Sequence, residues 1–168
     1  MSKYRLVEGA PQVSATSERK TSTVARDLSV AILAARFNEF IVDPMVEGAL
    51  QAWERHGGQP DRITLVRVPG AFELPLAAKR FAASKRYDAI VALGCVIRGD
   101  TPHFDYVAGE AARGIANAAM ETGVPVAFGV LTVENVEQAI ERAQPARMNK
   151  GGEALECAIE MALLLRQA

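Results

Sequence analysis

The sequence predicts an α/β fold, a three-layer α/β/α sandwich with a central four-stranded parallel sheet. From residue 28 onward, short apolar runs rich in β-branched residues alternate with longer runs of helical periodicity. Gly and Pro residues separate the two kinds of run. Strands that alternate with helices pair in parallel through right-handed crossovers, which place helices on both faces of the sheet.

The first predicted strand and helix follow directly from this pattern. Residues 28–34 are apolar and have the length of a buried strand. Asn38 can cap the following helix, which Gly57 and Gly58 end. We expect His56, beside these glycines, to be solvated surface. Apolar side chains recur in this helix at four-residue spacing, at Ile41, Met45, Ala49 and Trp53.

The alternation continues to the end of the chain. The further predicted elements are a strand at 63–68, a helix at 72–85, a strand at 87–95, a helix rich in small residues ending near 121, a strand at 124–131, and helices at 133–143 and 149–166. The last helix is expected to bury one apolar face, formed by Ala154, Cys157, Ala158, Met161 and Leu165.

The pattern predicts one domain, at residues 28–168, preceded by a tail at residues 1–27. A chain of 168 residues has the size of a single domain with one core. The tail has no periodicity beyond a short apolar patch at residues 4–7. It is either a disordered leader or, through this patch, an edge strand on a neighbouring subunit.

Composition excludes several classes of function. The 19 basic and 20 acidic residues are mixed along the chain, so no basic stripe for nucleic acid exists. No apolar run reaches the roughly 18 residues that a membrane span needs, so we expect no membrane partner. With 49% hydrophobic residues, the chain is rather apolar for a small monomer, which suggests subunit contacts.

The sequence supports neither a metal site nor a disulfide framework, because it contains few cysteines and histidines. Cys95 and Cys157 have no ligand spacing, and the two histidines are far apart. We therefore expect a reducing, cytoplasmic location and no metal.

A ligand site is expected beyond the carboxyl ends of the strands, in segments 35–38, 69–73, 97–103 and 132–135. Segment 94–101 has the glycines and hydroxyl of a phosphate-binding P-loop, but Asp100 stands where that loop needs lysine. This difference argues against a nucleotide triphosphatase. The strand-to-helix turn still offers N–H groups to a small phosphate, unless it is a simple capping turn.

Five side chains near these segments are candidates on chemical grounds. His103 begins a helix and can exchange protons near neutrality, although a lone histidine is more often structural. Phe37 can stack on a planar heterocycle or close the core. Glu73 can bind an NH-rich ring or cap a helix. Arg142 and Lys150 can each bind a phosphate or remain in solvent.

Five segments carry a resemblance to a known family. In chain order they are Ala35-Arg-Phe-Asn-Glu-Phe-Ile41, Val68-Pro-Gly-Ala-Phe-Glu-Leu-Pro75, Ala92-Leu-Gly-Cys-Val-Ile-Arg-Gly-Asp-Thr-Pro-His-Phe-Asp-Tyr106, Phe128-Gly-Val-Leu-Thr-Val-Glu-Asn135 and Asn149-Lys-Gly-Gly-Glu153. Together they resemble the lumazine synthase family over residues 28–168.

The resemblance implies a transferase of riboflavin biosynthesis that acts at the penultimate step without metal or organic cofactor. It implies condensation of 5-amino-6-(D-ribitylamino)uracil with 3,4-dihydroxy-2-butanone 4-phosphate to 6,7-dimethyl-8-ribityllumazine, with release of phosphate and water. The two substrates are small molecules, one of them phosphorylated.

The resemblance also implies roles for individual residues. His103 matches the proton-transferring histidine, and Asp100 and Thr101 match the turn that receives the butanone phosphate through backbone groups. The pyrimidine and its ribityl chain would contact Phe37, Ala71, Phe72, Glu73, Cys95, Val96 and Ile97. The neighbouring subunit would supply Phe128 and Arg142 to a shared site, and Lys150 is also expected there.

The expected partner is the chain itself, as a homopentamer or a larger assembly. Residues 144–148 lack the glycine-rich, lysine-containing character common in the family, and the tail is longer than usual. In this family that loop lies near contacts that distinguish pentamers and decamers from sixty-subunit shells. We expect pentamers, and the absence of an insertion in the loop slightly favours the icosahedral sixty-subunit shell.

Two other functional classes are weighed against this one. A non-catalytic flavin- or lumazine-binding protein, or a shell-forming scaffold, could share the flavodoxin-like topology. A signalling receiver of the same topology would need acidic residues after the first strand and a phosphorylatable Asp ending the third. Ala34, Ala35, Arg36 and Cys95 stand there instead.

Overall fold

The computed structural model describes residues 24–168, and the apolar patch at residues 4–7 lies outside them. The strands β1 (Val30–Ala35), β2 (Ile63–Val68), β3 (Ala89–Ile97) and β4 (Val126–Val133) form one sheet. Their order is β2-β1-β3-β4, and every neighbouring pair is parallel. The four-stranded parallel sheet predicted from the sequence is confirmed, as is its flavodoxin-like topology.

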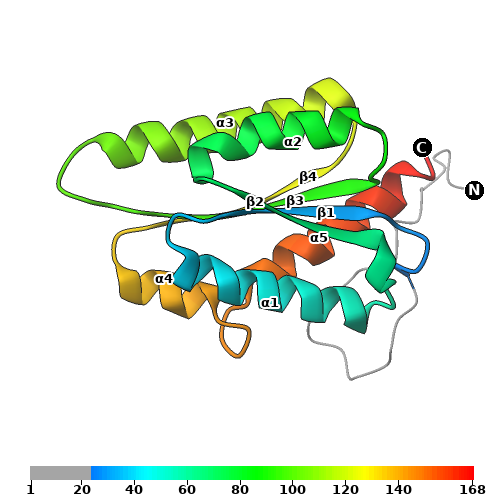
Figure 1. The fold of residues 1–168 in the computed structure, drawn as a ribbon, viewed down its shortest axis with the longest axis horizontal. Coiled ribbons are helices and arrows are strands. Elements are labelled where there is room, and N and C mark those ends of the chain that lie inside the picture. The colour runs from blue at the N-terminus through cyan, green and yellow to red at the C-terminus, as the bar shows by residue number, and fades with distance from the viewer. Residues whose placement is uncertain (1–23) are drawn as a thin grey trace, which may run out of the picture.

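Helices cover both faces of the sheet, as the three layers in Figure 1 show. One face is covered by α1 (Glu39–Arg55), α4 (Val136–Ala143) and α5 (Lys150–Leu165). The other is covered by α2 (Leu74–Ala83) and α3 (His103–Thr122). Short 3-10 turns, η1 (Pro60–Arg62) and η2 (Ala71–Glu73), flank β2.

Each face of the sheet has its own core because successive side chains of a strand point to opposite faces. On the α1 side, Ile32 of β1 belongs to a buried cluster with Trp53 and Ile159. On the α2 side, Leu33 belongs to a cluster with Leu74 and Ile115. β1 is buried along its whole length, which explains its continuous apolar sequence.

Several predicted element boundaries are wrong; β3 and β4, for example, each begin and end two residues later than predicted. Val133 was expected to begin a helix but ends β4, and α4 begins at Val136. Asn135 sets this start because its side chain accepts a 2.9 Å hydrogen bond from the backbone N–H of Gln138. The Gln138 side chain in turn accepts a 2.9 Å bond from the N–H of Glu134. The predicted helix at 72–85 begins only at Leu74, after the turn η2.

The start of α5 lies against α1 at a glycine. A Cβ added to Gly151 would overlap the carbonyl oxygen of Met45, so only glycine permits this close approach. Asn149 precedes the helix in the left-handed region, with φ of 47°, and accepts a 3.2 Å bond from the N–H of Gly152. The sequence Asn-Lys-Gly-Gly therefore specifies both the start of α5 and its packing.

His56, expected at the solvated surface, is only 7% exposed. Its Nε2 lies 3.1 Å from Glu156 of α5, and Arg55 donates a 2.7 Å hydrogen bond to the same carboxylate oxygen. Burial, the largest influence, raises the pKa of Glu156, but the bonds from His56 and Arg55 outweigh it and lower that pKa. No local pattern predicts this pairing because the partner lies 100 residues away.

The predicted buried face of α5 is partly wrong. Ala154 and Ala158 are buried, but Cys157 and Met161 are exposed and Leu165 is 44% exposed. The residues that pack against the sheet with the two alanines are Leu155, Ile159 and Ala162. The helix therefore has a second apolar stripe that this chain leaves uncovered.

None of the helices described is both long and apolar enough to span a bilayer.

Candidate active site

A cavity of about 440 Å³ lies at the carboxyl ends of β1, β2 and β3. In doubly wound sheets this edge is where ligands bind. Its lining consists of Phe37, Pro69, Gly70, Ala71, Phe72, Glu73, Cys95, Val96, Ile97, Gly99, Thr101, His103, Phe104 and Val107. The cavity thus combines apolar walls with a carboxylate, a hydroxyl and an imidazole.

Phe37 is presented by a short loop that is fixed at both sides. Its N–H donates a 3.0 Å hydrogen bond to the carbonyl of Pro69. Asn38 adopts φ of 59°, and its Nδ2 donates a 3.0 Å bond to the carbonyl of Cys95. Contrary to the sequence-based expectation, the Asn38 side chain makes no capping bond to α1. The Phe37 ring remains 71% exposed at the cavity mouth, free to stack on a ligand.

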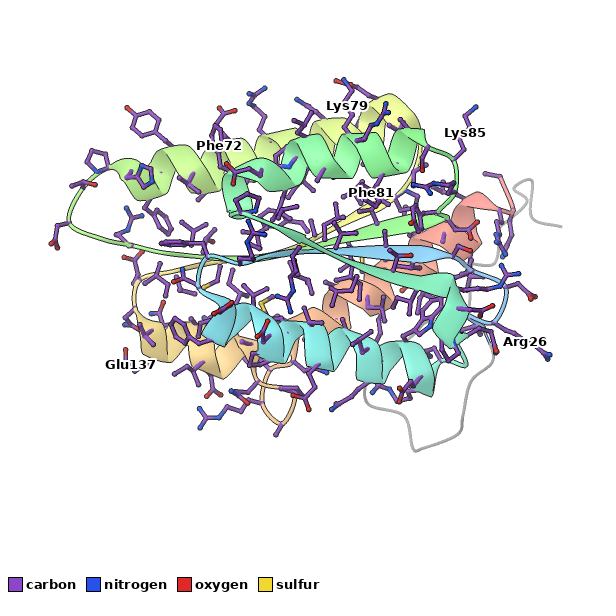
Figure 2. The ribbon with its side chains drawn as sticks, viewed as in Figure 1. Arg26, Phe72, Lys79, Phe81, Lys85 and Glu137 are labelled. Carbon is purple, nitrogen blue, oxygen red and sulfur yellow. The ribbon has the colours of Figure 1, made fainter. Side chains whose placement is uncertain are left out.

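Gly70 allows the loop after β2 to fold tightly. A Cβ at this position would lie 3.2 Å from Oε2 of Glu73 and 3.9 Å from Cβ of Phe37. The carboxylate of Glu73 therefore lies over the loop backbone, close to the loop that presents Phe37. Phe72 extends from η2 and is 56% exposed (Figure 2).

His103 begins α3 and follows the turn at residues 99–102. Its backbone N–H makes a long 3.5 Å contact with Oγ1 of Thr101. Both side chains are exposed to solvent and line the cavity. Asp100 is also exposed but is absent from the cavity lining. The structure therefore does not bring Asp100 to this cavity with the other predicted residues.

Cys95 contributes a neutral, apolar wall to the cavity. The residue is 2% exposed, and burial raises the pKa of its thiol to about 11. Since the thiolate is the reactive form of cysteine, this thiol is a poor nucleophile near neutral pH.

A second cavity, of about 370 Å³, lies along β4 and contains the remaining predicted residues. Its lining consists of Ala127, Phe128, Gly129, Val130, Leu131, Thr132, Arg142, Lys150, Glu153, Ala154 and Cys157. In this chain β4 is an edge strand that pairs with β3. The structure thus separates Phe128, Arg142 and Lys150 from the cavity that contains His103.

The cations of the second cavity are held by neighbouring groups. Arg142 donates a 3.1 Å hydrogen bond from Nη1 to the carbonyl of Gln138, which leaves its other donors available. Lys150 lies 2.6 Å from a carboxylate oxygen of Glu153. The cavity therefore presents a guanidinium and a paired ammonium beside the exposed ring of Phe128.

Some lining residues were not singled out from the sequence. Phe104 directly follows His103, and Glu153 ends the last of the five motifs. Three-residue spacing from Lys150 on a helix could have indicated Glu153. Within residues 24–168, no three His, Cys, Asp or Glu side chains are grouped so that they could hold a metal ion.

Comparisons with known proteins identify the family. Residues 27–166 match the family model described as 6,7-dimethyl-8-ribityllumazine synthase. The chain is 56% identical over 142 residues to the enzyme of that name from Chlorobium luteolum, covering 84% of this chain and 92% of the relative. It is 55% identical over 142 residues to the one from Chlorobium phaeovibrioides, with the same coverage. It is 52% identical over 143 residues to the one from Nitratidesulfovibrio vulgaris, covering 85% of this chain and 92% of the relative. The chain therefore belongs to the 6,7-dimethyl-8-ribityllumazine synthase family.

Proposed function

We propose that the cavity beyond β1, β2 and β3 is where this chain condenses 5-amino-6-(D-ribitylamino)uracil with 3,4-dihydroxy-2-butanone 4-phosphate. The products are 6,7-dimethyl-8-ribityllumazine, phosphate and water, which makes the chain a transferase of riboflavin biosynthesis. One observation carries the proposal: an exposed aromatic ring, a carboxylate and a histidine from three adjacent strand ends line one cavity.

The pyrimidine side of the cavity is assigned to the loops after β1 and β2. The exposed ring of Phe37 stacks on the planar pyrimidine, and Glu73 accepts hydrogen bonds from its N–H groups or the ribityl hydroxyls. Ala71 and Phe72 contact the ring and the ribityl chain. The floor of this part of the cavity is formed by Cys95, Val96 and Ile97.

The phosphate side is assigned to the turn before α3. The backbone N–H groups near Asp100 and Thr101 lie at the N-terminal end of a 20-residue helix, which favours anions. Of these two residues, Thr101 lines the cavity and Asp100 does not. The proposal assigns the phosphate to backbone groups of the turn, which keeps it away from the Asp100 carboxylate.

Proton transfer is assigned to His103. The 5-amino group adds to the C2 ketone and loses water to give an imine. A proton then leaves C3 as phosphate leaves C4, and the resulting enol becomes a ketone at C3. The ribitylamino nitrogen closes the ring on this ketone with loss of a second water. The imine step needs a group that both accepts and donates protons, as imidazole does. Phosphate departure is assisted by N–H groups and cations near the leaving group. Much of the acceleration comes from holding the two substrates together.

A second copy of the chain is proposed to complete the site. Phe128, Arg142 and Lys150 line the cavity along the edge strand β4, away from His103 in the same chain. Placed beside the His103 cavity of a neighbouring copy, Arg142 would contact the substrate phosphate and Lys150 would add positive charge. Pentamers, alone or in a sixty-subunit shell, are the proposed assemblies, and the cytoplasm is the proposed location.

The proposal is tested by mixing the purified protein with both substrates. Lumazine fluorescence and free phosphate are followed together, against the spontaneous reaction without protein. Equimolar appearance of both products, faster than in the control, is the expected result. An assembled sample that gives no acceleration would favour the alternative of a non-catalytic flavin- or lumazine-binding scaffold, which titration with lumazine would then examine.

A further inference from the structure

Arg98 directly follows β3, and its side chain contacts α3 and the loop after β4. Its Nε donates hydrogen bonds of 2.9 and 3.2 Å to the two carboxylate oxygens of Glu134, beyond the end of β4. Its Nη1 donates a 3.3 Å bond to Asp105 in the first turn of α3. Its guanidinium carbon lies 4.1 Å from the ring centroid of Phe104. We call these four residues the Arg98 cluster.

Residues of the Arg98 cluster flank the proposed phosphate turn and His103 in the sequence. Arg98 immediately precedes Gly99, while Phe104 and Asp105 immediately follow His103. The backbone N–H of Arg98 also donates a 2.9 Å bond to the carbonyl of Val133, which fixes the point where the chain leaves the sheet. The guanidinium thus connects both ends of the segment that contains Thr101 and His103.

Phe104 links the cluster to the cavity. Its ring lines the cavity and is half-buried against the core on the α2 side. The guanidinium lies close enough for a cation–π contact, which favours one position of the ring. A change at Arg98 would therefore alter a cavity wall without removing any group that touches a substrate.

We propose that Arg98 is a positioning residue of the synthase reaction, which holds the turn at residues 99–102 and His103 in the geometry that phosphate departure and proton transfer require. The inference rests on the proposed function of the cavity. Arg98 itself does not line the cavity, so its effect passes through Phe104, Asp105 and the turn.

The exposure of the cluster indicates that its role is local. The side chains of Arg98, Asp105 and Glu134 are 38%, 62% and 61% exposed. Ion pairs with this exposure contribute little to global stability, so loss of Arg98 should leave the fold intact. A shift of about 1 Å in a catalytic group can nevertheless slow a reaction by up to about 100-fold.

The first experiment compares Arg98→Ala and Arg98→Lys with Lys79→Ala. Lys79 also forms a surface ion pair, with Glu121, but it lies farther along α2 from Phe72 and the cavity (Figure 2). We expect Arg98→Ala to lower kcat/KM for the butanone phosphate about 10-fold and to change the KM for the pyrimidine less than about 2-fold. Arg98→Lys should recover only part of the loss because an ammonium cannot reproduce the planar fork. Lys79→Ala should match the wild type.

A double-mutant cycle separates positioning from general damage. If Arg98 acts by placing His103, Arg98→Ala should slow the His103→Ala variant far less than it slows the wild type. An equal fold-loss in both backgrounds would overturn the proposal, as would unchanged kinetics of Arg98→Ala.

Amide hydrogen exchange provides a readout that does not depend on activity. Exchange at residues 99–105 should become about 10-fold faster in Arg98→Ala and remain at the wild-type rate in Lys79→Ala. Unchanged exchange would show that Arg98 does not order this segment and would overturn the proposal. A wild-type protein without synthase activity would instead refute the proposed function and leave the ordering of the turn to be decided by exchange alone.

Discussion

The side-chain amide of Asn38 donates a 3.0 Å hydrogen bond to the carbonyl of Cys95, and this bond joins the loop after β1 to β3. Asn38 adopts φ of 59°, a conformation that asparagine tolerates better than most residues. The preceding residue is Phe37, the proposed stacking partner of the pyrimidine. The position of that ring therefore depends on a polar contact between two neighbouring strand ends.

Replacing Asn38 by glycine tests this dependence, because glycine keeps the left-handed backbone and removes only the amide. We expect the KM for the ribitylaminouracil to rise about 5- to 10-fold, corresponding to loss of one net hydrogen bond of about 1 kcal/mol. Steady-state kinetics with the butanone phosphate in excess would measure the change. An unaltered KM would mean that Phe37 is held without this bond.

His103→Ala should slow turnover by about 10- to 1000-fold without abolishing it, which is the range of acid–base catalysis by one side chain. The residual rate reflects positioning of the two substrates, which the variant retains. Size-exclusion chromatography and circular dichroism would establish that the variant is folded and assembled. Complete loss of activity in such a sample would contradict a large contribution of positioning to the rate.

Arg142→Ala should impair use of the phosphate substrate most. Loss of a charge-assisted contact corresponds to an increase in its KM of about 10- to 100-fold. Arg147→Ala is the matched control, since Arg147 lies five residues away, pairs with Glu141 and is absent from the lining of both cavities. Equal kinetics of the two variants would refute the role of Arg142.

Gly151→Ala should destabilise the protein, because the added Cβ would overlap the carbonyl oxygen of Met45. Such overpacking costs about 1–3 kcal/mol of unfolding free energy, measured by denaturant titration. Gly109→Ala is the comparison, since a Cβ at this position in α3 meets no atom within 4 Å. It should leave stability unchanged or raise it slightly, and equal destabilisation by both changes would contradict the packing argument.

Glu156→Gln should lower the unfolding free energy by about 2 kcal/mol near neutral pH, because His56 and Arg55 lose their shared anion. The folded-state pKa of Glu156 is lowered, so the carboxylate stabilises the fold fully above its ordinary pKa of 4.5. This contribution is lost as the pH falls through the lowered pKa. The difference between wild type and variant should therefore shrink on acidification, and Glu47→Gln, at an exposed site on α1, should show no such trend. A difference that does not vary with pH would contradict this account.

The fold could be predicted because local patterns specify it. The buried strand β1 is a continuous apolar run, and Gly57 and Asn149 mark helix ends by adopting positive φ. Contacts between distant segments leave no such pattern. His56 was misplaced because Glu156 lies 100 residues later, and α5 was misread because both of its sides are apolar.

The residues of the candidate site could be predicted from the motifs and from the ends of the predicted strands. Their arrangement in space could not. Periodicity and spacing do not indicate that Phe128 and Arg142 line a different cavity from His103, and only the family resemblance implied it by assigning both to a neighbouring subunit. Periodicity and spacing also give no indication that Arg98 contacts both Glu134 and Asp105, since these partners come from different elements. Such arrangements depend on how the sheet edges and helix ends are placed in space.

The separation of the two cavities has a thermodynamic consequence. On the proposed arrangement, a substrate that contacts His103 of one copy and Arg142 of the next adds binding free energy to their association. By reciprocity, association raises the affinity for substrate by the same factor by which bound substrate favours association. Substrate supply and the assembly equilibrium would then be linked, so the enzyme would be most firmly assembled when it is occupied.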